Sequence, residues 1–150
     1  VDSGSHWSLL LVLLPQSGVP SDMACYSHFD SSASTLNRRA ADSTARDISQ
    51  LLRARYTSTT PASPDTSSNK SLTVVEMDGS KQSNGYDCGF FVVDHAASIC
   101  RLLMRRLNSK ELVVTLSHDE ILATVRREVN QDSVRALRAD TEMFAQALRR

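Results

Sequence analysis

One segment, residues 88–107, limits the choice of fold more than any other. The run from Phe90 to Val93 is apolar throughout and would suit a strand, but from Ala96 to Leu107 the apolar positions recur with the period of a helix. A helix that is apolar almost all round at its start is one that is buried against other structure. The sequence therefore predicts a helix over residues 88–107, packed against a sheet.

Three other segments have the patterns of strands for this sheet. Residues 6–14 are a run of aliphatic side chains closed by Pro15, which predicts a central strand. Residues 24–30 alternate between small or apolar and polar side chains, and we expect them to pair with the first strand. A shorter strand is predicted at residues 72–77, which are rich in Thr and Val. Strands and helices together predict an α+β fold with a mixed sheet.

The remaining helices are predicted from periodicity and capping signals. Residues 34–56 have the spacing of an amphipathic helix. Residues 117–120 have the form of a capping box that opens a helix reaching about residue 129, and a last amphipathic helix is expected over 133–148. The apolar face predicted for the helix at 34–56 consists of Leu36, Ala40, Ala41, Ile48, Leu51 and Leu52.

Length and composition fit one domain over residues 1–150. The chain has a mass of 16.5 kDa, with 41% hydrophobic and 23% charged residues, which excludes a collagen-like or wholly disordered protein. Residues 57–70 contain two prolines and no large apolar side chain, so we expect a flexible insertion there. Because the chain begins with Val1 and its first apolar strand follows almost at once, we expect a partial domain.

Charge and cysteine content narrow the class of function further. The 17 basic and 17 acidic residues balance, so no net field attracts the chain to nucleic acid or to an anionic membrane. The basic excess of residues 101–150 is interspersed with acids and is interpreted as a solvated helix face. Three cysteines cannot all pair with one another and form no CxxC motif, which favours a reducing compartment. No apolar run reaches the roughly 18 residues of a membrane span.

Cys88 is the residue most suggestive of chemistry. A polar, glycine-containing loop at residues 78–87 delivers it to the first turn of a buried helix. At such a position the helix dipole and unpaired amides favour a thiolate, and the pKa of a cysteine falls from about 8.5 to roughly 3.5–7.5. Gly89 leaves room for a substrate backbone beside it. The alternative is that Cys88 is a small buried hydrophobe, which is common for free cysteines.

A thiolate nucleophile needs a base, and the base needs a residue that orients it. His6 opens the first predicted strand and Asp30 ends the second, so both side chains reach the same rim of the sheet if these strands are neighbours. Gln82, in the loop before Cys88, is a candidate hydrogen-bond donor to an oxyanion. Taken singly, each residue has an ordinary interpretation: a surface histidine, a helix N-cap aspartate and a loop glutamine.

Taken together, three segments resemble the proteases that process and remove ubiquitin-like modifiers, the sentrin (SUMO) protease family. These segments are GSHWSLLLVLLP at 4–15, HFDSS at 28–32 and QSNGYDCGFFVV at 82–93. The chain order His, Asp, Gln, Cys is that of the family and differs from papain, in which the cysteine comes first. The loop before the cysteine is most similar to the deneddylase branch of the family.

The resemblance implies a papain-like cysteine protease fold and a role for each matching residue. Cys88 is implied to be the nucleophile, His6 the general base and acid, Asp30 the residue that orients His6, and Gln82 the oxyanion donor. Trp7 is implied to shape a narrow passage for the Gly-Gly tail of the substrate, with a core anchor for its strand as the alternative role.

The resemblance also implies substrate, partners and location. The substrate is a ubiquitin-like modifier, either the neddylation modifier or SUMO, cleaved after its C-terminal Gly-Gly from a precursor or a conjugate. No metal or organic cofactor, nucleic acid or membrane is implied, and the protein is expected to be a monomer of the cytoplasm or nucleus. Two other functions stay open: a module that binds a modifier without cleaving it, and an acyltransferase of the same clan.

The other cysteines and histidines match no catalytic position. Cys25 and Cys100 are predicted to serve packing, with Cys100 on the core side of its helix. His28, His95 and His118 have no partner at metal-ligand spacing and are predicted to be structural or solvated.

Overall fold

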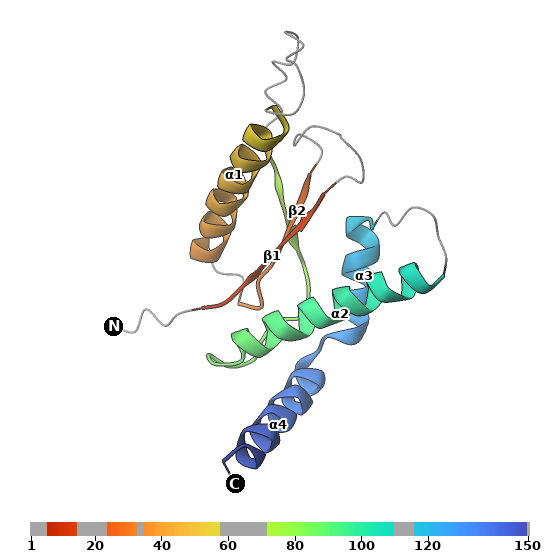
Figure 1. The fold of residues 1–150 in the computed structure, drawn as a ribbon. Helices are drawn as coiled ribbons and strands as arrows, with labels where there is room; N and C mark the ends of the chain where they lie inside the picture. The colour runs from red at the N-terminus through yellow and green to blue at the C-terminus, as the bar shows by residue number, and fades with distance from the viewer. Residues whose placement is uncertain (1–5, 15–23, 33–34, 58–71, 110–115, 150) are drawn as a thin grey trace.

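The computed structural model describes residues 6–14, 24–32, 35–57, 72–109 and 116–149. These residues form three strands and four helices in a mixed α+β arrangement (Figure 1). In chain order they are β1 (Leu9–Leu13), β2 (Cys25–Phe29), α1 (Thr35–Thr57), β3 (Val74–Met77), α2 (Cys88–Asn108), α3 (His118–Glu128) and α4 (Gln131–Ala147). The predicted insertion at 57–70 lies, after its first residue, outside the described residues.

The sheet has the order β1-β2-β3, with β1 antiparallel and β3 parallel to β2. Leu9 lies opposite Phe29, and Phe29 lies beside Met77. The predicted pairing of the first two strands is confirmed, but the prediction that the first is central is wrong. Among the described strands, β1 is at an edge and β2 is in the middle. The apolar run of β1 reflects helices on both faces of the sheet, rather than strands on both sides.

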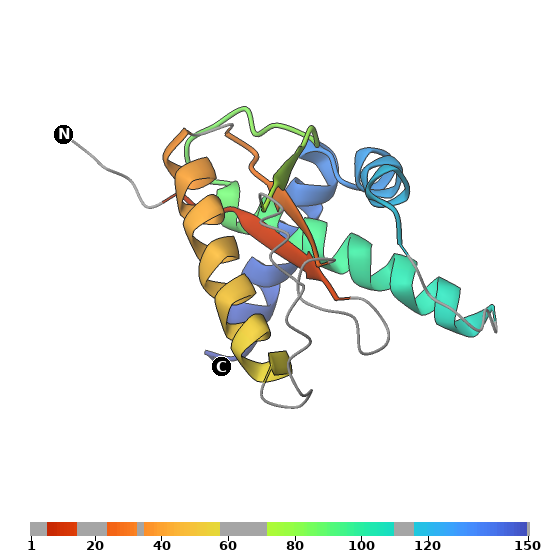
Figure 2. The same ribbon diagram turned by 90° about the horizontal axis from the view of Figure 1, so that it is seen from above.

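The two faces of the sheet have cores of different size. Toward α1, a small cluster of buried residues joins Tyr26, Ala45 and Val74. Toward α2 and α3, a larger cluster includes Phe29 and Phe91. Figure 1 and Figure 2 show the sheet between α1 on one side and α2 with α3 on the other. The predicted burial of the helix at 88–107 against a sheet is therefore confirmed.

α1 contacts the sheet through part of the predicted face and through further positions that were not predicted. Of the predicted positions, Ala41 is buried and Ile48 packs against the smaller cluster, whereas Leu36 and Leu51 are more than 70% exposed. Ala45, which was not predicted, is fully buried. The helix periodicity was therefore predicted correctly, and the buried face was predicted in part.

The two remaining cysteines also differ from prediction. Cys25 and Cys100 are both exposed thiols, so neither is buried for packing. On α2 the buried positions next to Cys100 are Ser98, Ile99 and Leu102. Cys100 therefore falls just outside the face that contacts the core.

α3 begins at the side-chain cap that the sequence predicts, and α4 begins at a cap that was not predicted. The Ser117 hydroxyl accepts a hydrogen bond from the backbone N–H of Glu120, and Asn130 caps α4.

Glu128, at the end of α3, connects this helix to α2. Burial raises the pKa of the Glu128 carboxyl, but hydrogen bonds outweigh this effect and lower the pKa to about 2. These hydrogen bonds come from Arg105, Ser98, Arg127 and Arg101. Within the described residues, no helix is long and apolar enough to span a membrane.

Candidate active site

The segments that carry the predicted site residues meet at one end of the sheet. Because β1 and β2 are antiparallel, the residues just before β1 lie beside those just after β2. His6 and Asp30 occupy these two positions, and His6 Nε2 lies 2.8 Å from Asp30 Oδ1. The strand pairing thus brings together a histidine and a carboxylate that are 24 residues apart in the chain.

Asp30 is held firmly for its contact with His6. Its side chain is only 3% exposed, and its Oδ1 also accepts hydrogen bonds from the backbone N–H of Ser32 at 2.9 Å and the Ser32 hydroxyl at 3.1 Å. The Asp30 carbonyl accepts from Lys81 Nζ at 3.0 Å. Since α1 begins only at Thr35, these bonds organise a turn after β2, and Asp30 is not the N-cap of α1.

The loop after β3 arrives at the same end because β3 is parallel to β2. Gln82 joins this loop to the turn after β2 through two bonds. Its backbone N–H donates to the Ser31 carbonyl at 3.0 Å, and its Oε1 accepts from the Ser31 hydroxyl at 2.7 Å. Gln82 Nε2 donates to the Asn84 carbonyl. An amide nitrogen has two hydrogens, so this bond uses one of the two. The role of Ser31 in fixing Gln82 was missed in the sequence, where it is one serine of the HFDSS segment.

Cys88 is the first residue of α2 and is 5% exposed. It lines a pocket of about 440 Å³. Trp7, the neighbour of His6, lies in the wall of the same pocket. At 63% exposure, Trp7 is not the core anchor that was its alternative role. The other lining residues are Gly85, Tyr86, Gly89, Phe90 and Val93.

The two glycines in this wall have no packing reason to be glycine. A Cβ atom built on Gly85 or Gly89 would meet no other atom within 4 Å. The space beside both residues is open, which fits the prediction that Gly89 leaves room for another chain to approach Cys88.

Asp87, the residue before Cys88, has contacts with α4 that were not predicted. Its carboxylate is buried, and Oδ2 accepts from Asn84 Nδ2 at 2.6 Å and from Gln131 Nε2 at 3.1 Å, while Oδ1 forms an ion pair with Arg138. Gln131 and Arg138 belong to α4, about 50 residues further along the chain than the loop. No short-range pattern reports a contact of this kind, so sequence reasoning had no signal for it.

The three histidines outside the site differ from one another. His28 Nδ1 bonds Glu76 at 2.9 Å, and His95 is buried between aromatic rings, so both are structural. His118 begins α3. Over the described ranges, no three His, Cys, Asp or Glu side chains gather as a metal site would require.

Comparison with known proteins places the chain in a family. Residues 1–140 match the profile described as the Ulp1 protease family, C-terminal catalytic domain. The chain belongs to this family. The resemblance predicted from the sequence is thus confirmed at the level of the Ulp1 protease family.

Two curated relatives of the chain are sentrin-specific protease 8 of Mus musculus and of Rattus norvegicus. Each is 29% identical to this chain over 103 residues, which is 69% of the chain and 37% and 38% of the two relatives. The aligned part therefore spans little more than a third of the relatives' length. No solved structure matches the chain.

Proposed function

We propose that this chain carries the catalytic centre of a cysteine peptidase with a papain-like fold, which cleaves after the C-terminal Gly-Gly of a ubiquitin-like modifier. One observation carries the proposal: Cys88 at the start of α2 shares a pocket with Trp7, and the preceding His6 is hydrogen-bonded to the buried Asp30. A thiol, an imidazole and a carboxylate are the groups that nucleophilic acyl transfer needs, and here the residue next to the imidazole lies in the wall of the thiol's pocket.

Each side chain has a distinct step in the proposed reaction. Asp30 holds Nε2 of His6, which leaves Nδ1 as the ring nitrogen that takes the proton from the Cys88 thiol. The thiolate attacks the carbonyl carbon of the last glycine, and the resulting oxyanion accepts hydrogen bonds from the Cys88 backbone N–H and the Gln82 amide. His6 then gives its proton to the leaving amine, and water hydrolyses the thioester to release the modifier and regenerate the thiol.

The lining of the pocket supports a tail of glycines as the substrate. Trp7 and Tyr86 supply exposed aromatic surface, while Gly85 and Gly89 add no side chain to the wall. An extended Gly-Gly segment can approach such a wall closely because it has no side chains of its own. The QSNGYDCG loop, which is similar to the deneddylase branch, favours the neddylation modifier over SUMO as the partner. A free catalytic thiol suits the reducing cytoplasm or nucleus.

Covalent capture tests this proposal. The full 150-residue chain is incubated with the neddylation modifier, SUMO and ubiquitin, each bearing a C-terminal electrophile, and the labelling rate is measured by mass shift. We expect Cys88→Ala to abolish labelling and His6→Ala to lower its rate on the order of a hundredfold. Cys25→Ala is the matched control and keeps the rate of the parent chain.

The outcomes separate the candidate functions. Labelling that persists in Cys88→Ala would show that the nucleophile is another residue. Reversible binding of an unmodified modifier by a chain that no electrophile labels would instead support the non-catalytic binding module. Faster labelling by SUMO than by the neddylation modifier would overturn the choice of modifier and leave the peptidase in place.

A further inference from the structure

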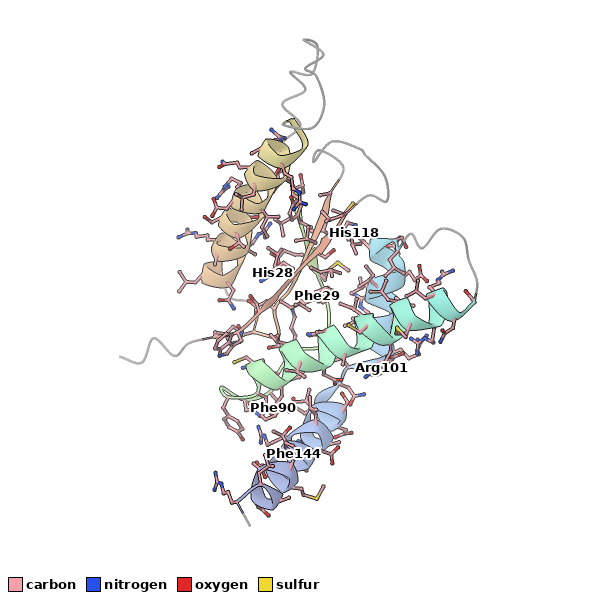
Figure 3. All side chains as sticks on the ribbon, in the orientation of Figure 1. His28, Phe29, Phe90, Arg101, His118 and Phe144 are labelled. Atoms are coloured by element: carbon pink, nitrogen blue, oxygen red, sulfur yellow. The ribbon has the colours of Figure 1, made fainter. Side chains whose placement is uncertain are left out.

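Arg138 of α4 lies against the loop that delivers Cys88. Its guanidinium forms an ion pair with Asp87 and stacks on two aromatic rings, 4.8 Å from the centroid of Tyr86 and 5.6 Å from that of Phe90. Figure 3 shows Phe90 at the start of α2, on the side that faces α4. Both rings also line the pocket of Cys88. One side chain of α4 thus touches the residues on both sides of the candidate nucleophile.

The ion pair is important because Asp87 directly precedes Cys88 in the chain. Asp87 is the N-cap of α2, a position from which an aspartate normally accepts hydrogen bonds from the amides of its own first helical turn. Here the Asp87 side chain makes no such bond, and its oxygens are engaged by Asn84, Gln131 and Arg138 instead. The carboxylate is therefore directed toward α4 and away from the amides at the start of α2.

A carboxylate that did cap α2 would oppose the proposed chemistry. It would place a negative charge beside the Cys88 thiolate and beside the oxyanion, and like charges in one site disfavour each other's ionised forms. It would also occupy amide donors of the helix start, which are the groups that stabilise an anion there.

We propose that Arg138 is a positioning residue that holds the Asp87 carboxylate away from the first turn of α2 and so keeps Cys88 reactive. Arg138 touches neither the thiol nor the substrate in this role, but acts through Asp87. The inference rests on the proposed function for its purpose, but the position of Asp87 and its effect on the thiol are measurable without any modifier.

The test is the rate of alkylation of Cys88 by iodoacetamide as a function of pH, on the full 150-residue chain and followed by peptide mass spectrometry. Arg138→Met keeps an apolar stem against Tyr86 and Phe90 but removes the charge. We expect it to slow alkylation of Cys88 about tenfold at pH 7 and to move the midpoint of the pH profile up by about one unit. The exposed Cys25 and Cys100 serve as internal references whose rates stay unchanged.

Two further variants distinguish positioning from simple loss of packing. Arg138→Lys keeps the charge and is expected to alkylate at least threefold faster at Cys88 than Arg138→Met does. Adding Asp87→Asn to Arg138→Met removes the carboxylate that is released, so the double variant is expected to recover most of the lost rate. A structural defect would not be repaired by a second substitution at Asp87.

Arg135→Ala is the matched control, since Arg135 lies on the same helix, is well exposed and, within the described residues, forms an ion pair with the exposed Asp132. It should leave alkylation of Cys88 unchanged. The proposal is overturned if Arg138→Met alkylates at the parent rate, if Lys and Met at position 138 behave alike, or if Asp87→Asn restores nothing. A failure of capture by modifiers together with these shifts would reject the proposed function alone.

Discussion

Two buried histidines on opposite faces of the sheet have opposite surroundings. His28, on β2, faces α1 and bonds the carboxylate of Glu76, which lies 3.8 Å from the guanidinium of Arg38 on α1. His95, on α2, faces the other side of the sheet, and its ring lies 5.2 Å from that of Phe29 and 6.1 Å from that of Phe91. One imidazole has an acidic partner, and the other lies in an aromatic core.

The two faces of the sheet differ in the interactions that hold their helices in place. The face toward α1 is held by a small apolar cluster with a polar network at its margin, and such partly exposed ion pairs contribute little to stability. The face toward α2 is held by a large apolar cluster that immobilises the helix carrying Cys88. The stability of the fold and the placement of Cys88 therefore depend on the same packed residues.

The largest effect is expected from a mutation that creates a cavity beside α2. Phe91 is fully buried in the larger cluster, so Phe91→Ala is expected to lower the free energy of unfolding by about 3–5 kcal/mol. Urea denaturation followed by circular dichroism measures the loss. Leu51→Ala on the exposed side of α1 is the control and should change it by less than about 0.5 kcal/mol. A loss below about 1.5 kcal/mol for Phe91→Ala would show that the face toward α2 is not the main source of stability.

A second test of the comparison is the dependence of stability on pH, to which His95 is expected to contribute. Burial lowers the pKa of His95, Asp94 raises it and Lys81 lowers it, and the result is about 4. The unfolded chain takes up this proton below about pH 6.5 and the folded chain only below about 4, so stability falls as the pH drops through that interval, by at most about 3 kcal/mol.

The measurement is the free energy of unfolding at pH 7, 5.5 and 4 for the parent chain and for His95→Leu, which cannot titrate. We expect the acid-induced loss to shrink in His95→Leu and to persist in His118→Gln, a control histidine at the start of α3. Equal losses in the parent and in His95→Leu would mean that the aromatic surroundings do not keep His95 neutral.

The smallest effect is expected on the face toward α1. The Glu76 side chain is 36% exposed, so replacing its charge in Glu76→Gln should cost less than about 1 kcal/mol by the same denaturation assay. The exposed Glu142→Gln on α4 is the matched control. A loss comparable to that of Phe91→Ala would reverse the comparison between the two faces.

Local patterns predicted the elements well, because periodicity and caps are properties of neighbouring residues. The four helices and three strands lie close to their predicted ranges, and the cap at Ser117 is where the sequence indicated. The predictions that failed concern how helices and strands that are distant in the sequence pack against one another. Three predictions were wrong in whole or in part: the central place of the first strand, the full extent of the buried face of α1, and the burial of Cys25 and Cys100. Each required knowing which element covers which side of the segment.

The candidate site divides in the same way. The meeting of His6 with Asp30 followed from adjacent strands, since two neighbouring strands bring their ends together. The contacts of Ser31 with Gln82 and of Arg138 with Asp87 could not be predicted, because each joins elements whose relative placement is set by tertiary packing. The roles of His6, Asp30, Gln82 and Cys88 in catalysis stay a prediction.

The parallel pairing of β2 with β3 has a consequence for the order of folding. The site exists only when contacts between residues 24 and 51 positions apart have formed, namely His6 with Asp30 and Ser31 with Gln82. Contacts so distant in the chain form slowly, because the entropy of closing long loops is lost before the contacts stabilise anything. α1 lies between the paired strands in sequence and can form locally without them. A nascent chain whose helices have already formed therefore still lacks the assembled site. The start of α2, which carries the Cys88 thiol, and the segment that carries His6 come together only after the strands have paired.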